Sequence, residues 1–508
     1  MKHSRTTCDW IGDRGRKALW AFIGLLAVLR ILMIFQIPFT DTTEARYAEI
    51  ARKMVETNDW VTPQFRYGVP FWGKPPLHTW LSASGMKLFG VNHFGGRIFI
   101  FLTAIAMVVM LYRWAREKAG NDYALVGITI LSSCGLFYLA SATVMTDLVM
   151  VAGTSMSMAG FYAAIHRMPK FRLWGYLFFV GLAIGMLAKG PVAVLLTALP
   201  IFLWVLIGNH WVDTWQRIPW IKGGLLSFAI FVPWYVIAEM KTPGFLEYFI
   251  VGEHFQRFLD SGWKGDLYGS GHSQPKGMIW IFWVLALLPW SFFFMAPFVR
   301  FKRVFSGIRN ENDGWSLYLL CWALSPMIFF TMAANIIAPY VFTGVPAVCF
   351  LSVNLWKFAS LDGSFPSKGT CRFFVGTALT AFLIFAIAYV AFSTLGSDAM
   401  KKSQMYAIAE IERLGGDDAG SVNYWQRRYY SAEFYTNGKS RVVEDEVGLL
   451  NLIENDKRDF LLTRSGNTKG IPQNVMERFA FKGRFGKDDL FFEKPLQAQS
   501  TSSSANEP

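Results

Sequence analysis

The stretch TDTTEARYAEIARKMVETNDWVTPQFRYGVPFWGKPP, residues 40–76, separates two strongly apolar segments and is rich in ionisable side chains. It begins with two acids close together, Asp41 and Glu44, followed by the basic–aromatic pair Arg46 and Tyr47. Charged groups beside a bilayer are costly, and they gather where they serve a function. The stretch therefore predicts a functional rim just outside the first membrane helix.

The composition around this stretch is that of a membrane protein. Of the 508 residues 53% are hydrophobic and only 17% are charged, which is unusual for a soluble globular protein. The formal net charge of +13 is first of all a topology signal in such a chain. No basic patch interleaved with aromatic residues occurs, so we expect no nucleic-acid partner. None of the five cysteines has metal-binding spacing.

About eleven apolar runs are long enough to cross a bilayer. A segment broken by proline or glycine, such as 76–90, raises the expected number to as many as thirteen, and the first run is too long for a cleaved signal. We predict an all-α membrane bundle of about 11–13 helices. The runs are 18–38, 97–113, 123–141, 146–165, 173–188, 190–208, 221–239, 277–299, 315–333, 335–357 and 372–395.

Basic residues orient these helices. With the N-terminus inside, every predicted inner connection carries lysine or arginine, as the positive-inside rule requires. An odd number of spans then places the C-terminal region outside. We therefore predict a multi-pass protein of the bacterial inner membrane with a cytoplasmic N-terminus and periplasmic chemistry.

The chain changes character after the last apolar run. We expect residues 1–395 to form the membrane domain, with outer loops 39–78 and 240–277, and 396–496 to form a small periplasmic α/β domain. RVV near 441, DFLLT and DDLFFEK resemble strands, and DEVGLLNLIENDK resembles a helix. The tail 497–508 has a disordered composition.

Residues 44–55 have helical periodicity, with Tyr47, Ile50, Ala51 and Met54 on one face. Asp41 precedes this helix and can point toward the mouth of the bundle. The plainer interpretation is a capped interfacial helix with ordinary solvated acids.

Three further ionisable residues lie where apolar runs begin or end. Lys74 is followed by two prolines, which hold the chain rigid and suit a phosphate contact; the alternative is a lysine that snorkels to water. Asp147 lies at the start of an apolar run. It is either a functional acid or the N-cap of a helix. Lys189, at a Gly-Pro break, is a second candidate for binding an anionic group.

The outer loop 240–277 concentrates polar groups among aromatics: Glu253, His254, Arg257, Lys264 and His272. His254 suits a metal ligand, an acid/base or a phosphate contact. No cofactor is certain; a divalent metal is one option, with Glu253 and His254 as its candidate ligands. No HExxH, Walker or GxSxG pattern occurs, which disfavours hydrolases and nucleotide-dependent enzymes.

The pattern DTTEARYAEIARKM…DW…KPPL, followed by VMTDLVM, LAKGP and EHFQRF, resembles the GT-C glycosyltransferases of the protein O-mannosyltransferase and lipid A aminoarabinose transferase type. The resemblance covers roughly residues 18–300. It implies a GT-C fold and inverting transfer of a sugar from polyprenyl phosphate, usually undecaprenyl phosphate in bacteria. Thr43 and Gly73 stand where such enzymes often have acids.

The same resemblance implies roles for individual residues. Asp41 or Glu44 matches the acidic motif of the first loop, and Asp147 a second acid; these are the catalytic candidates. Tyr47 matches the aromatic residue of the motif and Lys74 the lysine that contacts the donor phosphate, while His254 matches a histidine of the later loop. Arg46, Lys189 and Arg257 complete the substrate-binding candidates.

The acceptor stays open at this point. An anionic lipid A phosphate needs no strong base, whereas a protein or glycan hydroxyl needs an acid such as Asp41 to take its proton. We expect lipid A or lipopolysaccharide first, and transfer to protein or another envelope glycan second. A lipid or sugar transporter is the alternative of another class, but it predicts charges at mid-membrane depth and a repeat, and we find neither in the sequence.

Overall fold

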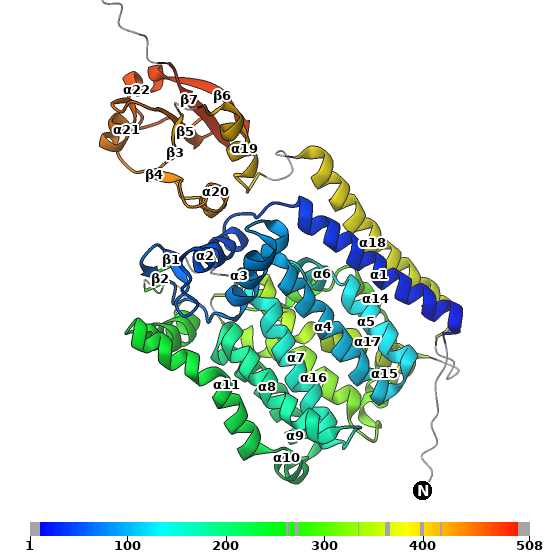
Figure 1. Ribbon diagram of the computed structural model, residues 1–508. Coiled ribbons are helices and arrows are strands. Elements are labelled where there is room, and N and C mark those ends of the chain that lie inside the picture. The colour runs from blue at the N-terminus through cyan, green and yellow to red at the C-terminus, as the bar shows by residue number, and fades with distance from the viewer. Residues whose placement is uncertain are drawn as a thin grey trace, which may run out of the picture. The chain divides into compact units, whose positions relative to one another are not determined.

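The computed structural model describes residues 11–260, 263, 265–269, 274–333, 335–360, 366–396, 401–416 and 419–495. Lys264, His272 and the tail 497–508 of the sequence predictions lie outside these residues. The chain divides into two units (Figure 1): Met1–Ile37 with Ile50–Val390, here the membrane unit, and Pro38–Glu49 with Ala391–Pro508, here the C-terminal unit. The division falls inside the helices α2 (Thr43–Thr57) and α18 (Lys368–Leu395).

Long apolar helices build the membrane unit. Among the described residues, eight are long and apolar enough to cross a membrane, so the predicted multi-pass bundle is confirmed. They are α1 (Asp13–Gln36), α4 (His93–Ala119), α7 (Thr146–Ile165), α8 (Phe171–Lys189), α9 (Pro191–Gly208), α11 (Trp220–Lys241), the continuous pair η3 (Ala338–Gly344) and α17 (Val345–Ala359), and α18.

Three of the eleven predicted runs are helical but do not form a straight span. The run 277–299 becomes a pair of helical segments, Met278–Ala286 and Trp290–Arg309, bent by 106°, which makes a ninth span if the pair crosses together. The runs 123–141 and 315–333 form helices too short for the same test. The shorter elements are α3 (Leu77–Phe89), α5 (Asn121–Ser133), α6 (Gly135–Ala140), α10 (Trp211–Arg217), η1 (Glu247–Gln256), α12 (Arg257–Leu259), α13 (Met278–Ala286), α14 (Trp290–Met295), η2 (Ala296–Arg300), α15 (Phe301–Arg309), α16 (Trp315–Phe330), and the strands β1 (Gln64–Arg66) and β2 (Val69–Pro70).

Helices α7 and α8 form a tight antiparallel hairpin because small residues let their backbones meet. A Cβ atom on Gly153 would lie 2.7 Å from the Gly181 carbonyl oxygen, and one on Gly181 would lie 2.4 Å from Ser157 Oγ. Ser157 also donates a hydrogen bond of 2.8 Å to the Phe178 carbonyl. Close approach of this kind is how helices associate in lipid, where no hydrophobic driving force acts between them. The hairpin brings the start of α7 and the end of α8 to the same end of the bundle.

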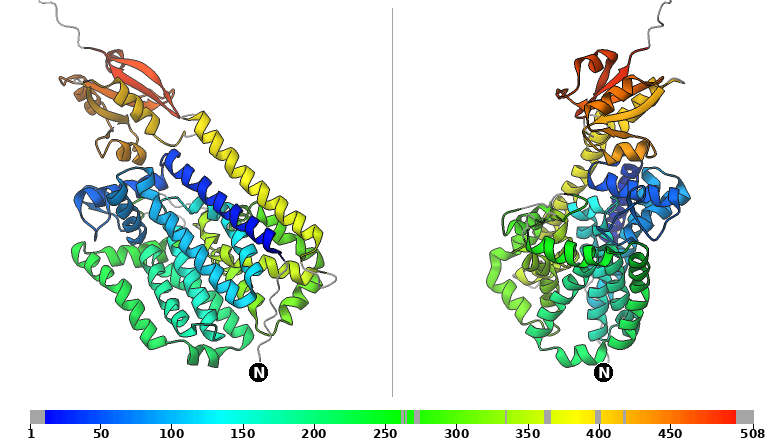
Figure 2. Two further views of the ribbon diagram at one scale, coloured as in Figure 1. Left: turned by 45° about the vertical axis from the view of Figure 1, so that its right-hand side comes forward. Right: turned by 90° about the vertical axis from the view of Figure 1, so that its left-hand side faces the viewer.

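Helices α1 and α18 lie side by side along one flank of the membrane unit (Figures 1 and 2), although they are far apart in sequence. Leu29 and Met33 of α1 share a buried cluster with Ala381 and Phe385 of α18. Tyr138 stacks on Phe385 with ring centroids 3.8 Å apart. The first and last spans are therefore packed together directly.

The C-terminal unit contains a five-stranded sheet with the order β4-β3-β5-β7-β6. Strand β3 is parallel to β4 and to β5, whereas β7 is antiparallel to both β5 and β6. The strands are β3 (Ala419–Trp425), β4 (Arg441–Val443), β5 (Arg458–Arg464), β6 (Phe479–Phe485) and β7 (Asp488–Glu493), and the helices are α19 (Met405–Leu414), α20 (Tyr430–Tyr435), α21 (Glu446–Ile453) and α22 (Gln473–Arg478).

Alternation along the central strand gives this sheet two cores. Phe460 and Leu462 of β5 pack on the side of α19 and α20, and Leu461 between them packs on the side of α21 and α22. Successive side chains of a strand point to opposite faces, so helices must cover both sides. The segments predicted as strands and helix in this region form β4, β5, β7 and α21, and the predicted small α/β fold is confirmed.

Candidate functional site

The end of the α7–α8 hairpin carries a buried ion pair. Asp147 lies in the first turn of α7 and Lys189 is the last residue of α8, and Lys189 Nζ lies 2.6 Å from Asp147 Oδ1. The N-cap of α7 is Met145, with no side-chain capping bond, so the N-cap interpretation of Asp147 is wrong. Lys189 Nζ also lies 4.9 Å from the ring centroid of Tyr340 in η3.

A second cluster joins the rigid loop before α3 to the element after α11. Lys74 Nζ lies 2.8 Å from Glu253 Oε2, and it also donates to the carbonyl of Gly73. Arg257 Nη1 lies 3.0 Å from Glu253 Oε1 and 3.1 Å from Oε2. Lys74 is therefore ion-paired, with its side chain 18% exposed.

Aromatic side chains frame this cluster. The Tyr248 hydroxyl lies 3.4 Å from Glu253 Oε1, and Tyr268 accepts from Trp72 N at 3.0 Å while donating to the Pro70 carbonyl at 2.9 Å. A Cβ atom on Gly73 would lie 3.0 Å from the Phe71 ring and 3.3 Å from Tyr268. The residue before Lys74 thus has little room for a larger side chain.

His254 connects the two clusters. Its Nδ1 lies 2.7 Å from the Phe249 carbonyl and its Nε2 lies 3.3 Å from the Lys189 carbonyl. Gly190 has φ +86°, and a Cβ there would lie 3.2 Å from His254 Cε1 and 2.5 Å from the Phe249 ring. The Gly-Pro break after Lys189 therefore makes the space in which the histidine ring sits.

The pKa shifts follow from burial and from these charges. Burial opposes ionisation of Glu253, but the charges of Lys74 and Arg257 outweigh it and lower the pKa of Glu253. Burial, together with the nearby Lys74 charge, lowers the pKa of His254, so this ring is neutral at pH 7. Burial opposes the charge on Arg257, yet Glu253, Tyr340 and Asp266 together raise its pKa.

Glu253 and His254 do not fit a metal site as they stand. Both carboxylate oxygens of Glu253 face cations, and the shorter contact of His254 places a proton on Nδ1 against a carbonyl. Within the described residues, no group of three histidine, cysteine, aspartate or glutamate side chains can hold a metal ion.

The remaining predicted residues belong to the C-terminal unit. The carboxylate of Asp41 accepts hydrogen bonds from Tyr430 N at 2.8 Å, from Ser431 N at 3.3 Å and from the Ser431 hydroxyl. Tyr430 and Ser431 begin helix α20, so Asp41 caps a helix that follows it by nearly 400 residues. Burial raises the pKa of Asp41 to about 6, although the hydrogen bonds from Ser431 and Tyr430 act against this shift.

The other residues of this group lie on helix α2. Tyr47 is buried, as the predicted face of this helix requires, and the Arg46 guanidinium lies 5.4 Å from the Tyr47 ring centroid. Glu44 is buried too, so the interpretation of this acid as solvated is wrong. Ile50, Ala51 and Met54 of the same face are buried as well. The structure thus gathers the predicted residues into two groups: Lys74, Asp147, Lys189, Glu253, His254 and Arg257 in the membrane unit, and Asp41, Glu44, Arg46 and Tyr47 in the C-terminal unit.

Several side chains that contact the predicted site residues could not be found from the sequence. Tyr340 and Ser431 lie in segments without any charge pattern, and Asp266 is one acid in a polar loop. Arg257 Nη1 lies 3.5 Å from Asp266 Oδ2. The concentration of aromatic residues in loop 240–277 was the one sequence signal for such partners, and Tyr248 and Tyr268 belong to it.

Comparison with known proteins gives a consistent picture. The family model for dolichyl-phosphate-mannose-protein mannosyltransferases matches residues 20–249. The chain is 28% identical over 310 residues, 59% of its own length and 52% of the relative, to the undecaprenyl phosphate-alpha-4-amino-4-deoxy-L-arabinose arabinosyl transferase of Erwinia tasmaniensis. It is 26% identical over 361 residues, 68% of its length and 61% of the relative, to the second such enzyme of Sodalis glossinidius. The chain thus spans less than two thirds of the length of these curated relatives.

A solved structure shares the fold along almost the whole chain. The crystal structure of ArnT from Cupriavidus metallidurans bound to undecaprenyl phosphate superposes with a TM-score of 0.70 at 18% identity, covering 94% of this chain and 98% of that one. The apo form of the same protein gives 0.69. The likeness therefore includes the membrane bundle and the small C-terminal domain.

Proposed function

We propose a function from one premise, that this chain belongs to the GT-C superfamily of membrane glycosyltransferases, of the lipid A aminoarabinose transferase type. It transfers a sugar from a polyprenyl phosphate to an acceptor in the cell envelope. The donor is an undecaprenyl phosphate-linked aminopentose, following the names of its relatives. The proposed acceptor is lipid A. The active site faces the periplasm, in the orientation that the basic inner loops support.

The observation that carries this proposal is a buried carboxylate beneath two more exposed cations. The side chain of Glu253 is 5% exposed, whereas those of Lys74 and Arg257 are 18% and 23% exposed. The carboxylate thus holds both cations in place, and part of each cationic side chain stays exposed. Preorganised cations of this kind stabilise charge that develops on a phosphate.

The proposed reaction uses these groups in order. Lys74 and Arg257 bind the donor phosphate. As the bond between the anomeric carbon and the phosphate oxygen breaks, its electron pair goes to that phosphate, where the two cations stabilise it. An acceptor oxygen forms the new bond from the opposite face, which inverts the configuration.

Asp147 and Lys189 complete the proposed site of the membrane unit, and the candidates Asp41, Glu44, Arg46 and Tyr47 belong to the C-terminal unit. Asp147, held by Lys189, is the carboxylate that favours an oxocarbenium-like transition state. An acceptor phosphate brings its own negative charge and needs no base. Asp41 and Glu44 remain the candidate acids of the first loop, and Arg46, Tyr47 and His254 candidate substrate contacts.

We assign a role to each of the two domains predicted from the sequence. Residues 1–395 supply the proposed catalytic membrane domain with its outer loops 39–78 and 240–277, although residues 38–49 pack with the C-terminal unit. Residues 396–496 form an extramembrane domain on the periplasmic side.

Transfer to protein or another envelope glycan is the second candidate, because the matching family model is that of protein mannosyltransferases. An acceptor hydroxyl must lose its proton, which gives Asp41 or Glu44 the role of base. The two candidates differ in the product, not in the donor.

Mass spectrometry of lipid A and of lipid-linked sugars, from cells with and without the chain, tests the proposal. We expect cells that lack the chain to lose one pentosyl group from lipid A and to accumulate the undecaprenyl phosphate-linked donor. Unchanged lipid A with an accumulated donor would move the acceptor to protein or another glycan. No change in either pool while the chain is expressed would contradict transfer itself.

A further inference from the structure

Helix α15 (Phe301–Arg309) has two sharply different sides. Val304 is buried, and a Cβ on Gly307 would lie 2.4 Å from the Phe358 ring of α17, so this side packs against the bundle. On the other side Phe301 and Phe305, one helical turn apart, are exposed and stack with ring centroids 5.9 Å apart. Two stacked phenylalanines in contact with water would be costly, so a covering partner is expected.

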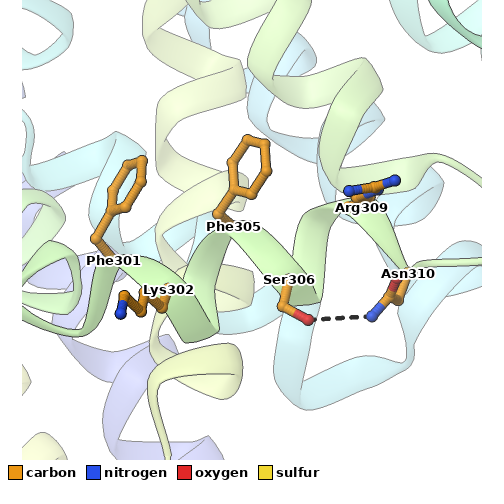
Figure 3. A pocket seen from close by; sticks show the side chains of 6 residues that line it. All are labelled: Phe301, Lys302, Phe305, Ser306, Arg309 and Asn310. Carbon is orange, nitrogen blue, oxygen red and sulfur yellow. Dashed lines mark hydrogen bonds between the residues drawn. The ribbon is translucent and has the colours of Figure 1, made fainter.

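The exposed side is hollowed. A depression of about 430 Å³ is lined by Phe301, Lys302, Phe305, Ser306, Arg309 and Asn310 (Figure 3). The two phenylalanine rings project to the same side of the helix, and Ser306 accepts a hydrogen bond of 3.1 Å from Asn310 Nδ2. Apolar rings, two cations and two small polar groups therefore meet in one place.

The charge of this segment has one sign. Residues 296–310 contain Arg300, Lys302, Arg303 and Arg309 and no acid. Arg300 donates to the Ala359 carbonyl at 2.5 Å, whereas Lys302, Arg303 and Arg309 form no ion pair with any described residue. The two acids that follow are engaged elsewhere.

These two acids are Glu311 and Asp313. Glu311 accepts a hydrogen bond from Ser316 N, and Asp313 pairs with Lys118. Among the described residues neither of these two acids neutralises α15, so its cations are available to an anion.

The segment is preceded by exposed apolar side chains that suit contact with lipid. Phe292, Met295 and Val299, which lead into α15, are exposed apolar side chains, and Trp290–Arg309 is half of the bent pair that is apolar enough to span. A basic amphipathic helix after such a run lies in the membrane interface.

The hollow also lies far from the proposed donor site. The continuous helix Ala338–Ala359 carries Tyr340, beside Lys189, near its start, and ends at Ala359, which binds Arg300. At 1.5 Å per residue its 22 residues extend about 30 Å, the thickness of a bilayer core. The two sites therefore belong to opposite membrane surfaces.

We propose that this hollow binds the headgroup of an anionic phospholipid in the leaflet opposite to the donor site. The lipid phosphate lies between Lys302 and Arg309, Ser306 and Asn310 donate hydrogen bonds to its oxygens, and an acyl chain covers Phe301 and Phe305. The positive charges of Lys302 and Arg309 favour a lipid with a net negative headgroup over a zwitterionic lipid. The rings of Phe301 and Phe305 need an acyl chain to cover them, which favours a lipid over a free anion.

Native mass spectrometry of the purified full chain, after delipidation, tests the site with phosphatidylglycerol, phosphatidylcholine and inorganic phosphate as probes. We expect phosphatidylglycerol adducts to exceed phosphatidylcholine adducts. Lys302→Gln and Arg309→Gln should each lower phosphatidylglycerol binding at least about tenfold, as expected for loss of a direct hydrogen bond to a charged group. Arg303→Gln removes the same charge from the same helix outside the hollow, so only diffuse attraction is lost and binding should fall at most about fivefold.

Three results would overturn the proposal. Equal losses in all three variants would mean diffuse attraction instead of a site. Equal amounts of phosphatidylglycerol and phosphatidylcholine adducts would show that the net charge of the lipid does not decide binding. Displacement of the lipid by millimolar inorganic phosphate would show a site for a free anion. The three side chains are exposed, so unchanged melting temperatures are expected and serve as the control for folding.

Discussion

Glu253 in the membrane unit and Asp41 in the C-terminal unit are both largely buried carboxylates, yet their pKa values shift in opposite directions. Two cations, Lys74 and Arg257, lower the pKa of Glu253 despite its burial. Burial raises the pKa of Asp41 to about 6 against the hydrogen bonds from Ser431 and Tyr430, and the negative charge of Glu433 adds to the rise. At Glu253 the charges of two cations outweigh desolvation, whereas at Asp41 the hydrogen bonds do not. The surroundings of Glu253 therefore favour its charged form, which holds the two cations. The surroundings of Asp41 favour its protonated form below about pH 6.

Replacing Lys74 by alanine should have the largest effect. The change removes a proposed phosphate contact and leaves Glu253 with one cation fewer, so we expect transfer to fall at least about 100-fold, as for loss of one preorganised charge-stabilising group. Initial rates with a polyprenyl-phosphate sugar donor measure this. Lys87→Ala, at the exposed end of α3, removes the same charge and should leave the rate within about twofold. Equal rates for Lys74→Ala and the wild type would refute the phosphate-binding role.

Glu253→Gln should cost less than the loss of Lys74, because both cations remain while their carboxylate support is lost. We expect about a tenfold lower rate and a stability loss of about 2 kcal/mol, below the usual cost of breaking a fully buried pair since both cations are partly exposed. Rates and thermal unfolding in detergent report the two effects. Glu247→Gln, on the same element η1 but exposed, is the matched control.

The pH dependence of Glu253 has a definite sign. Its folded pKa lies below the unfolded value, so its carboxylate stabilises the fold above the unfolded pKa, and this contribution disappears as the pH falls through the folded pKa. The stability gap between wild type and Glu253→Gln should therefore narrow below about pH 4.5. A gap that widens on acidification would contradict the assignment.

Asp41→Asn should show the opposite pH dependence. The folded pKa of about 6 lies above the model value of 3.8, so the folded state binds the proton more tightly and wild-type stability falls as the pH rises through this window. The shift corresponds to roughly 2–3 kcal/mol. Lowering the pH from 7 to 4 should thus stabilise the wild type relative to Asp41→Asn, whose amide stays neutral.

Thermal unfolding of both proteins across that pH range measures the difference. Asp445→Asn, which replaces the aspartate that caps α21 in the same unit, controls for the loss of a capping carboxylate. A constant gap between wild type and Asp41→Asn would mean that Asp41 does not titrate there.

Removal of divalent metal should have the smallest effect. The oxygens of Glu253 face Lys74 and Arg257 and the His254 ring faces carbonyl groups, so we expect activity within about twofold after EDTA. Transfer assays with EDTA, and after readdition of Zn²⁺ or Mg²⁺, test this. A loss that only one metal restores would assign a metal to the reaction.

The sequence predicted elements well where one residue pattern decides the outcome. The period of α2, the apolar runs and the strand-like composition of β5 each depend on neighbours within one element. Charged residues at the ends of apolar runs, such as Lys74, Asp147 and Lys189, were found because a membrane makes such positions conspicuous. The pairing of Lys74 with Glu253 could not be predicted, because it joins residues 179 apart through the packing of separate loops.

Asp41 shows a further limit of sequence reasoning. Its position before an amphipathic helix indicated a free acid at a cavity mouth, but its carboxylate caps α20, and neither Tyr430 nor Ser431 signals this from its own surroundings. The bent pair of helices after residue 277 is similar, because its apolar run has the length of a straight span and only the structure shows the 106° bend.

The segment Pro38–Glu49 comes early in the chain but belongs to the unit formed by its last residues. Phe39 is fully buried there, packing on Phe434 with ring centroids 4.8 Å apart, and Asp41 N donates to the Lys402 carbonyl at 2.7 Å. A shortened protein ending at Val390 would therefore lose the partners of its own first loop and not merely a C-terminal appendage. Likewise, a chimaera that takes its C-terminal domain from a relative must take residues 38–49 from the same relative. We therefore expect the amino-acid sequences of these two distant segments to vary together.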